Sequence, residues 1–158
     1  MSHAPRIAIL FGSESDRPTM EETAKVLDSF GVSHEMHHAS AHRSPEKVRE
    51  IVASAPGRGV RLFIAAAGMA NHLAGTVAAH TTLPVIGVPL PGTSLGGADA
   101  LYSTVQMPPG VPVATVAIGV PGAKNAAILA VQILAIADPS LRLKLEDLKE
   151  RLARGEKI

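Results

Sequence analysis

Apolar runs alternate with amphipathic stretches along this chain, in the order expected when strands and helices follow one another. Continuous apolar runs at residues 7–11, 62–67, 84–88 and 113–118 predict strands, and residues 32–39 predict a weaker one that holds three histidines. Short apolar runs of this kind are typical of strands buried on both faces of a parallel sheet. The pattern therefore predicts five parallel strands.

The stretches between the strands carry helix signals. Asp16 is predicted to cap a helix that has Pro18 in its first turn and ends at Gly31, and Ser44 and Pro45 are predicted to begin the next. Further helices are predicted at residues 71–79, 98–106, 122–137 and 139–153. The helix at 122–137 is apolar on nearly every side, which predicts burial all round, often against another subunit.

This alternation predicts an α/β fold: a three-layer, doubly wound, five-stranded parallel sheet of flavodoxin-like order 2-1-3-4-5, with a C-terminal helical extension. We interpret residues 1–158 as a single α/β domain. Leucines at 141, 145, 148 and 152 give the helix at 139–153 one apolar stripe, so we expect it to dock on a neighbouring subunit. In the 2-1-3-4-5 order, the loops that follow the first three strands lie side by side.

Composition narrows the classes of partner. With 46% hydrophobic residues the chain can build a sizeable core, and 15 Lys and Arg against 14 Asp and Glu give no basic excess for a nucleic acid or an anionic membrane. The longest apolar stretch, 126–137, is shorter than the roughly 18 residues of a membrane span. The chain has no cysteine, which fits a reducing compartment, and we expect a cytoplasmic protein.

The first predicted loop, GSESD at 12–16, joins a strand to a helix N-terminus, where backbone N–H groups favour an anion. Ser13 and Ser15 add hydroxyl donors, and the Asp16 carboxylate is suited to the hydroxyls of a ribose. The alternative is that Ser15 and Asp16 merely cap the helix.

The second and third loops add charge and proton transfer. In SAHR at 40–43, Arg43 and Ser40 can bind a phosphate, and His42 can give or take a proton near neutral pH. In AGMANH at 67–72, Gly68 would let the backbone approach a flat ligand, and His72 begins a helix. The alternatives are a surface arginine and structural histidines.

Other conspicuous side chains receive structural interpretations. The histidines at 34, 37 and 38 lack a carboxylate cluster, and adjacent strand residues point to opposite faces, so we expect no metal. We expect His80 to lie on the surface and Tyr102, the only tyrosine, to pack within its helix.

Six sequence blocks together resemble one known family. They are G-S-x-S-D, S-A-H-R, N-H-L-A-G, V-I-G-V-P, A-L-Y-S-T-V-Q-M-P-P-G-V-P-V-A-T-V-A-I and A-K-N-A-A-I-L-A, between residues 6 and 137. They are similar to the PurE family, the 5-(carboxyamino)imidazole ribonucleotide mutases of de novo purine synthesis. The resemblance implies conversion of N5-carboxyaminoimidazole ribonucleotide to 4-carboxyaminoimidazole ribonucleotide without a metal or cofactor, and typically a homo-octamer.

The resemblance also implies roles for individual residues. Ser13, Asp16, Ser40, His42 and Arg43 match functional positions of the family. Asp16 would hold the ribose diol, and Arg43 would hold the phosphate with Ser15 and Ser40. His42 would act as general acid and then general base, with Gly68 and His72 forming the wall that retains CO2.

The residues alone leave open several other functions, both within this family and outside it. A second form of the family carboxylates aminoimidazole ribonucleotide directly with CO2; Arg43 and the His72-Leu73 pair favour the mutase. The third loop departs from the usual mutase pattern, with Met69, Asn71 and Ala74 where glycine, alanine and proline are common. A flavin-binding or phospho-acceptor module of the same fold, or a scaffold with a vestigial site, are the other interpretations.

Overall fold

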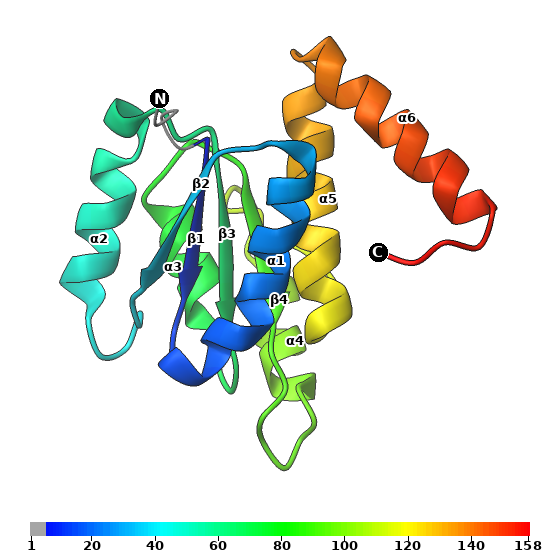
Figure 1. Cartoon of the computed structure of the whole chain (residues 1–158). Helices are drawn as coiled ribbons and strands as arrows, with labels where there is room; N and C mark the ends of the chain where they lie inside the picture. Colours follow the sequence, from blue (N-terminus) through cyan, green and yellow to red (C-terminus); the bar gives the residue numbers. More distant parts are fainter. Residues whose placement is uncertain (1–5) are drawn as a thin grey trace.

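The computed structural model describes residues 6–158 and contains one five-stranded parallel sheet of order β2-β1-β3-β4-β5, as predicted. The strands and helices alternate along the chain (Figure 1). In chain order they are β1 (Ile7–Phe11), α1 (Arg17–Phe30), β2 (His34–His38), α2 (Pro45–Ser54), β3 (Leu62–Ala67), α3 (His72–Ala79), β4 (Val85–Pro89), α4 (Ala98–Val105), β5 (Ala114–Thr115), α5 (Val120–Ala135) and α6 (Pro139–Ala153). Two 3-10 turns, Glu14–Asp16 and Pro56–Arg58, complete the described elements.

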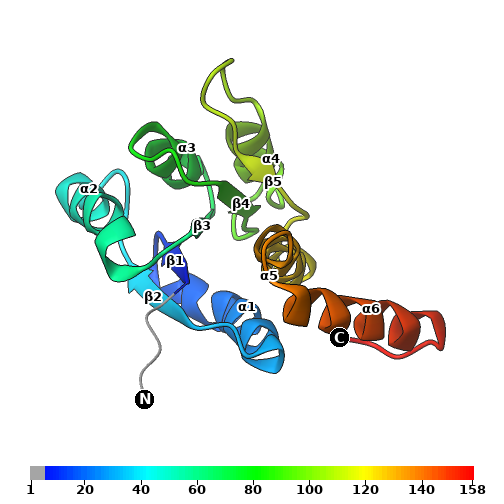
Figure 2. The same ribbon diagram turned by 90° about the horizontal axis from the view of Figure 1, so that it is seen from above.

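The sheet separates two apolar layers. Figure 2 shows α1 and α5 on one face of the sheet and α2, α3 and α4 on the other. Alternate residues of a strand face opposite layers. Accordingly, Ile7 and Ile9 of β1 pack in the cluster that includes α1 and α5, whereas Ala8 and Leu10 pack in the cluster that includes α2 and α3. This burial on both faces explains the continuous apolar runs of the central strands.

The ends of the first helix follow the sequence signals only in part. Gly31 ends α1 as predicted: it adopts the left-handed φ of 70° and donates its N–H to Asp28 O at 2.9 Å. Asp16 is the N-cap residue of α1, as predicted, but its side chain makes no capping hydrogen bond with that helix. Its carboxylate accepts the N–H of Ser13 at 3.1 Å, because the chain inserts a 3-10 turn before the helix.

The fifth strand is shorter than the predicted 113–118. Only Ala114 and Thr115 pair with β4, opposite Ile86 and Gly87. Pro112, which has no N–H to donate, stands just before this pair, and Gly119, at φ 73°, turns the chain into α5 soon after it. The sheet therefore has β2 at one edge and a two-residue strand at the other.

The long apolar helix α5 is not buried all round within this chain. It packs on α1, where Thr23 Oγ1 donates to Ala123 O at 2.8 Å, but it leaves Gln132 on the surface and Ile136, just beyond its end, 80% exposed. Within one chain α5 is therefore only partly buried, because α6 covers only part of the remaining surface, and its burial against another subunit stays a prediction.

The predicted C-terminal helix is present and extends away from the sheet (Figure 1). Leu141 and Leu148 of its leucine stripe are buried against the cluster of α1 and α5, and Lys144 Nζ donates to Phe30 O at 2.6 Å. Leu143 and Leu152 stay 67% and 37% exposed. The helix is therefore held to its own chain at one face, and its docking on a neighbouring subunit stays a prediction.

Candidate active site

The loops that follow β1, β2 and β3 meet at the carboxyl end of the sheet, at the lower end of the molecule in Figure 1. They line a cleft of about 490 Å³. Seven of the eight predicted site residues line it, namely Ser13, Ser15, Asp16, Ser40, His42, Arg43 and Gly68. The eighth, His72, is hydrogen-bonded to His42 at the same place. Adjacent parallel strands end at one edge, which is why residues so distant in sequence gather here.

The first loop presents hydroxyls beside a half-buried carboxyl. Ser13 Oγ and Ser15 Oγ lie 2.9 Å apart, and the N–H of Ser13 holds Asp16 through Oδ2. Burial raises the pKa of the Asp16 carboxyl, opposed by the Ser13 hydrogen bond and by the charges of His38 and Arg43. The ionised Asp16 carboxylate is therefore poorly solvated in the free protein. Hydrogen bonds donated by a bound ligand would compensate for the missing water.

The second loop is fixed to the first by its arginine. Arg43 Nη2 donates to Gly12 O at 2.8 Å, and the N–H of Arg43 donates to Ser40 Oγ at 3.2 Å. Ser44 precedes α2 as predicted but makes no side-chain capping bond with it; its hydroxyl instead accepts the N–H of Ser40 at 2.9 Å. The loop is therefore held by its own hydroxyls while the guanidinium lines the cleft.

Two imidazoles from different loops form a close pair. His42 Nε2 lies 2.7 Å from His72 Nδ1, and the ring centroids are 4.8 Å apart at 71°. One nitrogen of this contact donates and the other accepts, so the pair shares a proton, and the tautomer of each ring depends on the other. His72 is the first residue of α3, so the position of that helix sets the geometry of the pair.

A fourth loop, which the sequence analysis did not include in the site, also lines the cleft. Pro91, Gly92 and Thr93 follow β4 and reach the cleft beside Gly68. A Cβ at Gly68 would lie 3.4 Å from Leu90 O, at the near limit of ordinary van der Waals contact with the chain just after β4. The sequence did hold a signal, because β4 neighbours β3 in the predicted order and a glycine-rich loop follows it.

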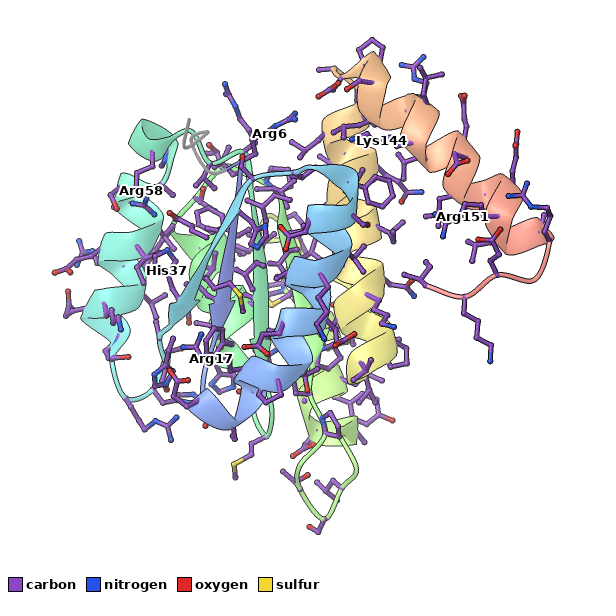
Figure 3. The ribbon with its side chains drawn as sticks, viewed as in Figure 1. Arg6, Arg17, His37, Arg58, Lys144 and Arg151 are labelled. Atoms are coloured by element: carbon purple, nitrogen blue, oxygen red, sulfur yellow. The ribbon has the colours of Figure 1, made fainter. Side chains whose placement is uncertain are left out.

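The structure also places several residues that lie outside the cleft lining. Arg17, at the start of α1 (Figure 3), donates to both oxygens of Glu14 at 2.7 and 2.9 Å and stacks over Phe11. His80 is exposed as predicted, whereas Tyr102 is 70% exposed, so its predicted packing within α4 is wrong. Among residues 6–158 no group of three or more His, Asp or Glu side chains is placed to hold a metal ion.

The arrangement defines a chemistry. One side of the cleft offers the Arg43 guanidinium and serine hydroxyls for an anion, Asp16 can accept hydrogen bonds from a diol, and the His42–His72 pair can move a proton. These groups of the cleft fit a polar, phosphorylated small molecule. As a separate finding, none of the helices in the described part of the chain, 6–158, is long and apolar enough to cross a membrane.

Comparisons with known proteins show which family the whole chain resembles. The family model described as AIR carboxylase matches residues 6–155. The N5-carboxyaminoimidazole ribonucleotide mutase of Pyrococcus abyssi is 51% identical over 150 residues, covering 95% of this chain and 85% of that protein, and the mutase of Synechocystis sp. is 52% identical over 151 residues, covering 96% and 85%. The crystal structure of Treponema denticola PurE superposes with a TM-score of 0.86 at 33% identity, covering 96% of this chain and 93% of that one.

Proposed function

The chain belongs to the AIR carboxylase family, and from this premise we propose that it is an N5-carboxyaminoimidazole ribonucleotide mutase of purine biosynthesis with His42 as its acid and base. The mutase activity rests on curated relatives at about half identity over most of the chain. The observation that carries the role of His42 is its 2.7 Å contact with His72, in the cleft that Arg43 and the serine hydroxyls also line.

The nucleotide is oriented by the first two loops. Asp16 accepts hydrogen bonds from the ribose diol, and Arg43, Ser15 and Ser40 hold the phosphate, with Ser13 supporting the first loop. This assignment is supported by the position of all five residues in the cleft lining and by the bond from Arg43 to Gly12 O, which ties the two loops together. The imidazole ring of the substrate then lies toward His42 and Gly68.

The reaction moves one carboxylate and returns one proton. The bond between the exocyclic nitrogen and the carbamate carbon breaks, CO2 leaves, and its bonding electrons stay on the nitrogen, which takes a proton from His42. The C4 carbon then attacks CO2, and the neutral His42 removes the C4 proton so that the ring regains aromaticity. The proton balance is zero, and no cofactor enters this scheme.

The CO2 has to stay beside the aminoimidazole for the second half of the reaction. The backbone around Gly68, together with His72, forms the wall that retains it, and the cleft supplies the effective concentration that dissolved CO2 lacks. Support comes from Gly68 lining the cleft and from His72 contacting His42.

A substrate comparison tests the activity directly. The protein is given N5-carboxyaminoimidazole ribonucleotide or, separately, aminoimidazole ribonucleotide with bicarbonate, and formation of the 4-carboxylated product is followed. Fast conversion of the first substrate alone is expected. Fast conversion of the second alone would instead assign a carboxylase that uses CO2 directly, which is the other candidate.

We also propose that the chain works as one domain in a cytoplasmic homo-octamer, with α6 docking on a neighbouring subunit. The apolar side chains of Leu95, Tyr102 and Leu143 support association, since each is more than 60% exposed in the single chain. Light scattering at micromolar concentration is expected to give a mass well above the 16.4 kDa of one chain. A monomer would contradict the assembly without touching the activity.

A further inference from the structure

Asn71, next to His72, is fully buried and hydrogen-bonded to α4. Its side chain is 0% exposed, and its Nδ2 donates to Thr104 Oγ1 at 2.9 Å and to Val88 O at 3.4 Å. Its backbone N–H donates to Ser103 Oγ at 2.8 Å. Asn71 therefore attaches the chain just before α3 to two consecutive residues of α4 and to β4.

The directions of these hydrogen bonds are fixed by α4 itself. Thr104 Oγ1 donates its hydrogen to Ala100 O at 2.6 Å, and Ser103 Oγ donates to Asp99 O at 2.7 Å. Both hydroxyls can then only accept from Asn71. This fixes the amide orientation, because the opposite one would turn Oδ1 toward Val88 O. The attachment is thus directional and admits one arrangement.

The backbone at Asn71 is a tight turn. Its φ of −76° and ψ of 75°, with the N–H of His72 donating to Ala70 O at 2.9 Å, define an inverse γ-turn. Two residues earlier, Met69 adopts a φ of 56°, which a side chain disfavours. The inverse γ-turn is itself a common conformation, but the left-handed backbone of Met69 persists only when its surroundings hold it. Here the hydrogen bonds of Asn71 supply that hold.

The arrangement leaves one polar atom unused. Asn71 Oδ1 is buried without a hydrogen-bond partner among the described residues. A buried acceptor in this state lowers stability, so fold stability alone does not favour an asparagine here over an apolar side chain. What the asparagine does provide is a set of hydrogen bonds to α4 that hold the N-terminal end of α3 in place, and the first residue of α3 is His72.

We propose that Asn71 is a positioning residue that sets the geometry and the shared proton of the His42–His72 pair by attaching the start of α3 to Thr104. The inference deepens the proposed function and rests on it for its kinetic readout. The attachment reaches the imidazole pair through His72: Asn71 does not line the cleft, whereas His72 Nδ1 meets His42 Nε2. A loosened turn would let His72 drift and leave His42 free to exchange its tautomers.

Four variants of the full-length protein test this proposal. Asn71→Ala removes the attachment from one side, and Thr104→Val removes it from the other while keeping the shape of the side chain. Thr104→Ser keeps the hydroxyl and serves as the conservative rescue. Thr23→Val is the matched control, because it deletes another fully buried threonine hydroxyl, which is bonded to Ala123 O outside the cleft lining.

Two readouts separate positioning from stability. We expect Asn71→Ala and Thr104→Val to lower kcat about 10-fold with KM changed less than about twofold, and to displace the pH–rate profile. Their His42 and His72 imidazole 15N shifts, measured without substrate, should move toward those of a free tautomer mixture. Thr104→Ser and Thr23→Val should keep the wild-type kcat, pH profile and 15N shifts, although Thr23→Val lowers the melting temperature.

The proposal is overturned if Asn71→Ala and Thr104→Val behave as Thr23→Val does, with a lower melting temperature but unchanged kcat, pH profile and 15N shifts. The 15N shifts need no turnover. Absence of mutase activity in the wild-type protein would therefore refute the proposed function, while the imidazole signals would still decide the role of Asn71.

Discussion

Replacement of His42 by asparagine gives the sharpest test of the mechanism. Asparagine is polar and compact, but it cannot be protonated near neutral pH, so it removes proton transfer without adding bulk. His42 is exposed and its side chain contacts His72, whereas the groups assigned to the phosphate and ribose lie on other residues. The substitution should therefore leave both the fold and the nucleotide site in place.

The size of the expected loss follows from the role. A positioned general acid or base contributes about 10²- to 10⁴-fold to a rate, and His42 is assigned both half-reactions, so we expect kcat to fall by at least about 10³-fold. This corresponds to about 4 kcal/mol in the barrier, at about 1.36 kcal/mol per decade. The dissociation constant for aminoimidazole ribonucleotide should change less than about threefold, because Arg43 and Asp16 are untouched.

The assay needs both numbers from the same preparation. Product formation from N5-carboxyaminoimidazole ribonucleotide gives kcat, and calorimetric titration with aminoimidazole ribonucleotide gives the dissociation constant. The matched control is His80→Asn, since His80 is exposed just beyond the end of α3, outside the cleft lining. A His42→Asn enzyme within about fivefold of the wild-type kcat would refute the acid–base role.

Three further predictions follow from named contacts. Arg43→Met should raise KM about 10- to 100-fold, because a charge-assisted phosphate contact is lost, and steady-state kinetics measure this; an unchanged KM would contradict the phosphate role. Asp16→Asn should weaken nucleotide binding in calorimetry yet slightly raise the melting temperature of the free protein at pH 7, because burial raises the pKa of Asp16 and the charged form is the costly one. Burial alone would raise the pKa of Glu35, but the hydrogen bonds from Arg58 and the nearby His37 ring outweigh it and lower that pKa. The ionised Glu35 therefore stabilises the fold above its ordinary pKa of 4.5, and this stabilisation is lost as the pH falls below it. Urea unfolding between about pH 6 and about pH 3 should show that the free energy of unfolding falls less with pH in Glu35→Gln than in the wild type. An equal fall in both proteins would contradict this role of Glu35.

The sequence predicted the fold and the location of the cleft because both depend on patterns that can be read directly from the order of residues. Apolar strands, glycine and proline boundaries, and the order of a doubly wound sheet determine which loops meet. The predicted neighbours Ser13, Arg43 and Gly68 do line one cleft. Strand order carries this information because the carboxyl ends of adjacent parallel strands share an edge.

The details that failed depend on tertiary contacts. Asp16 has the residue type and place of an N-cap, yet a 3-10 turn directs its carboxylate to Ser13 instead. Tyr102 has a large aromatic side chain of the kind that usually packs against a helix, but it lies on the exposed side of α4. The hydrogen bond between His42 and His72 joins two loops that lie 30 residues apart in the sequence, and no local pattern predicts such a contact.

The two ends of the strand order have a consequence for how copies of this chain can associate. A sheet grows by main-chain pairing along an exposed outer strand, and polar side chains or very short outer strands prevent that growth. Here one outer strand has the sequence HEMHH and the other is two residues long. A continuous intermolecular sheet is therefore disfavoured, which protects the protein from fibril-like stacking at high concentration and leaves lateral contacts between helices as the route to assembly.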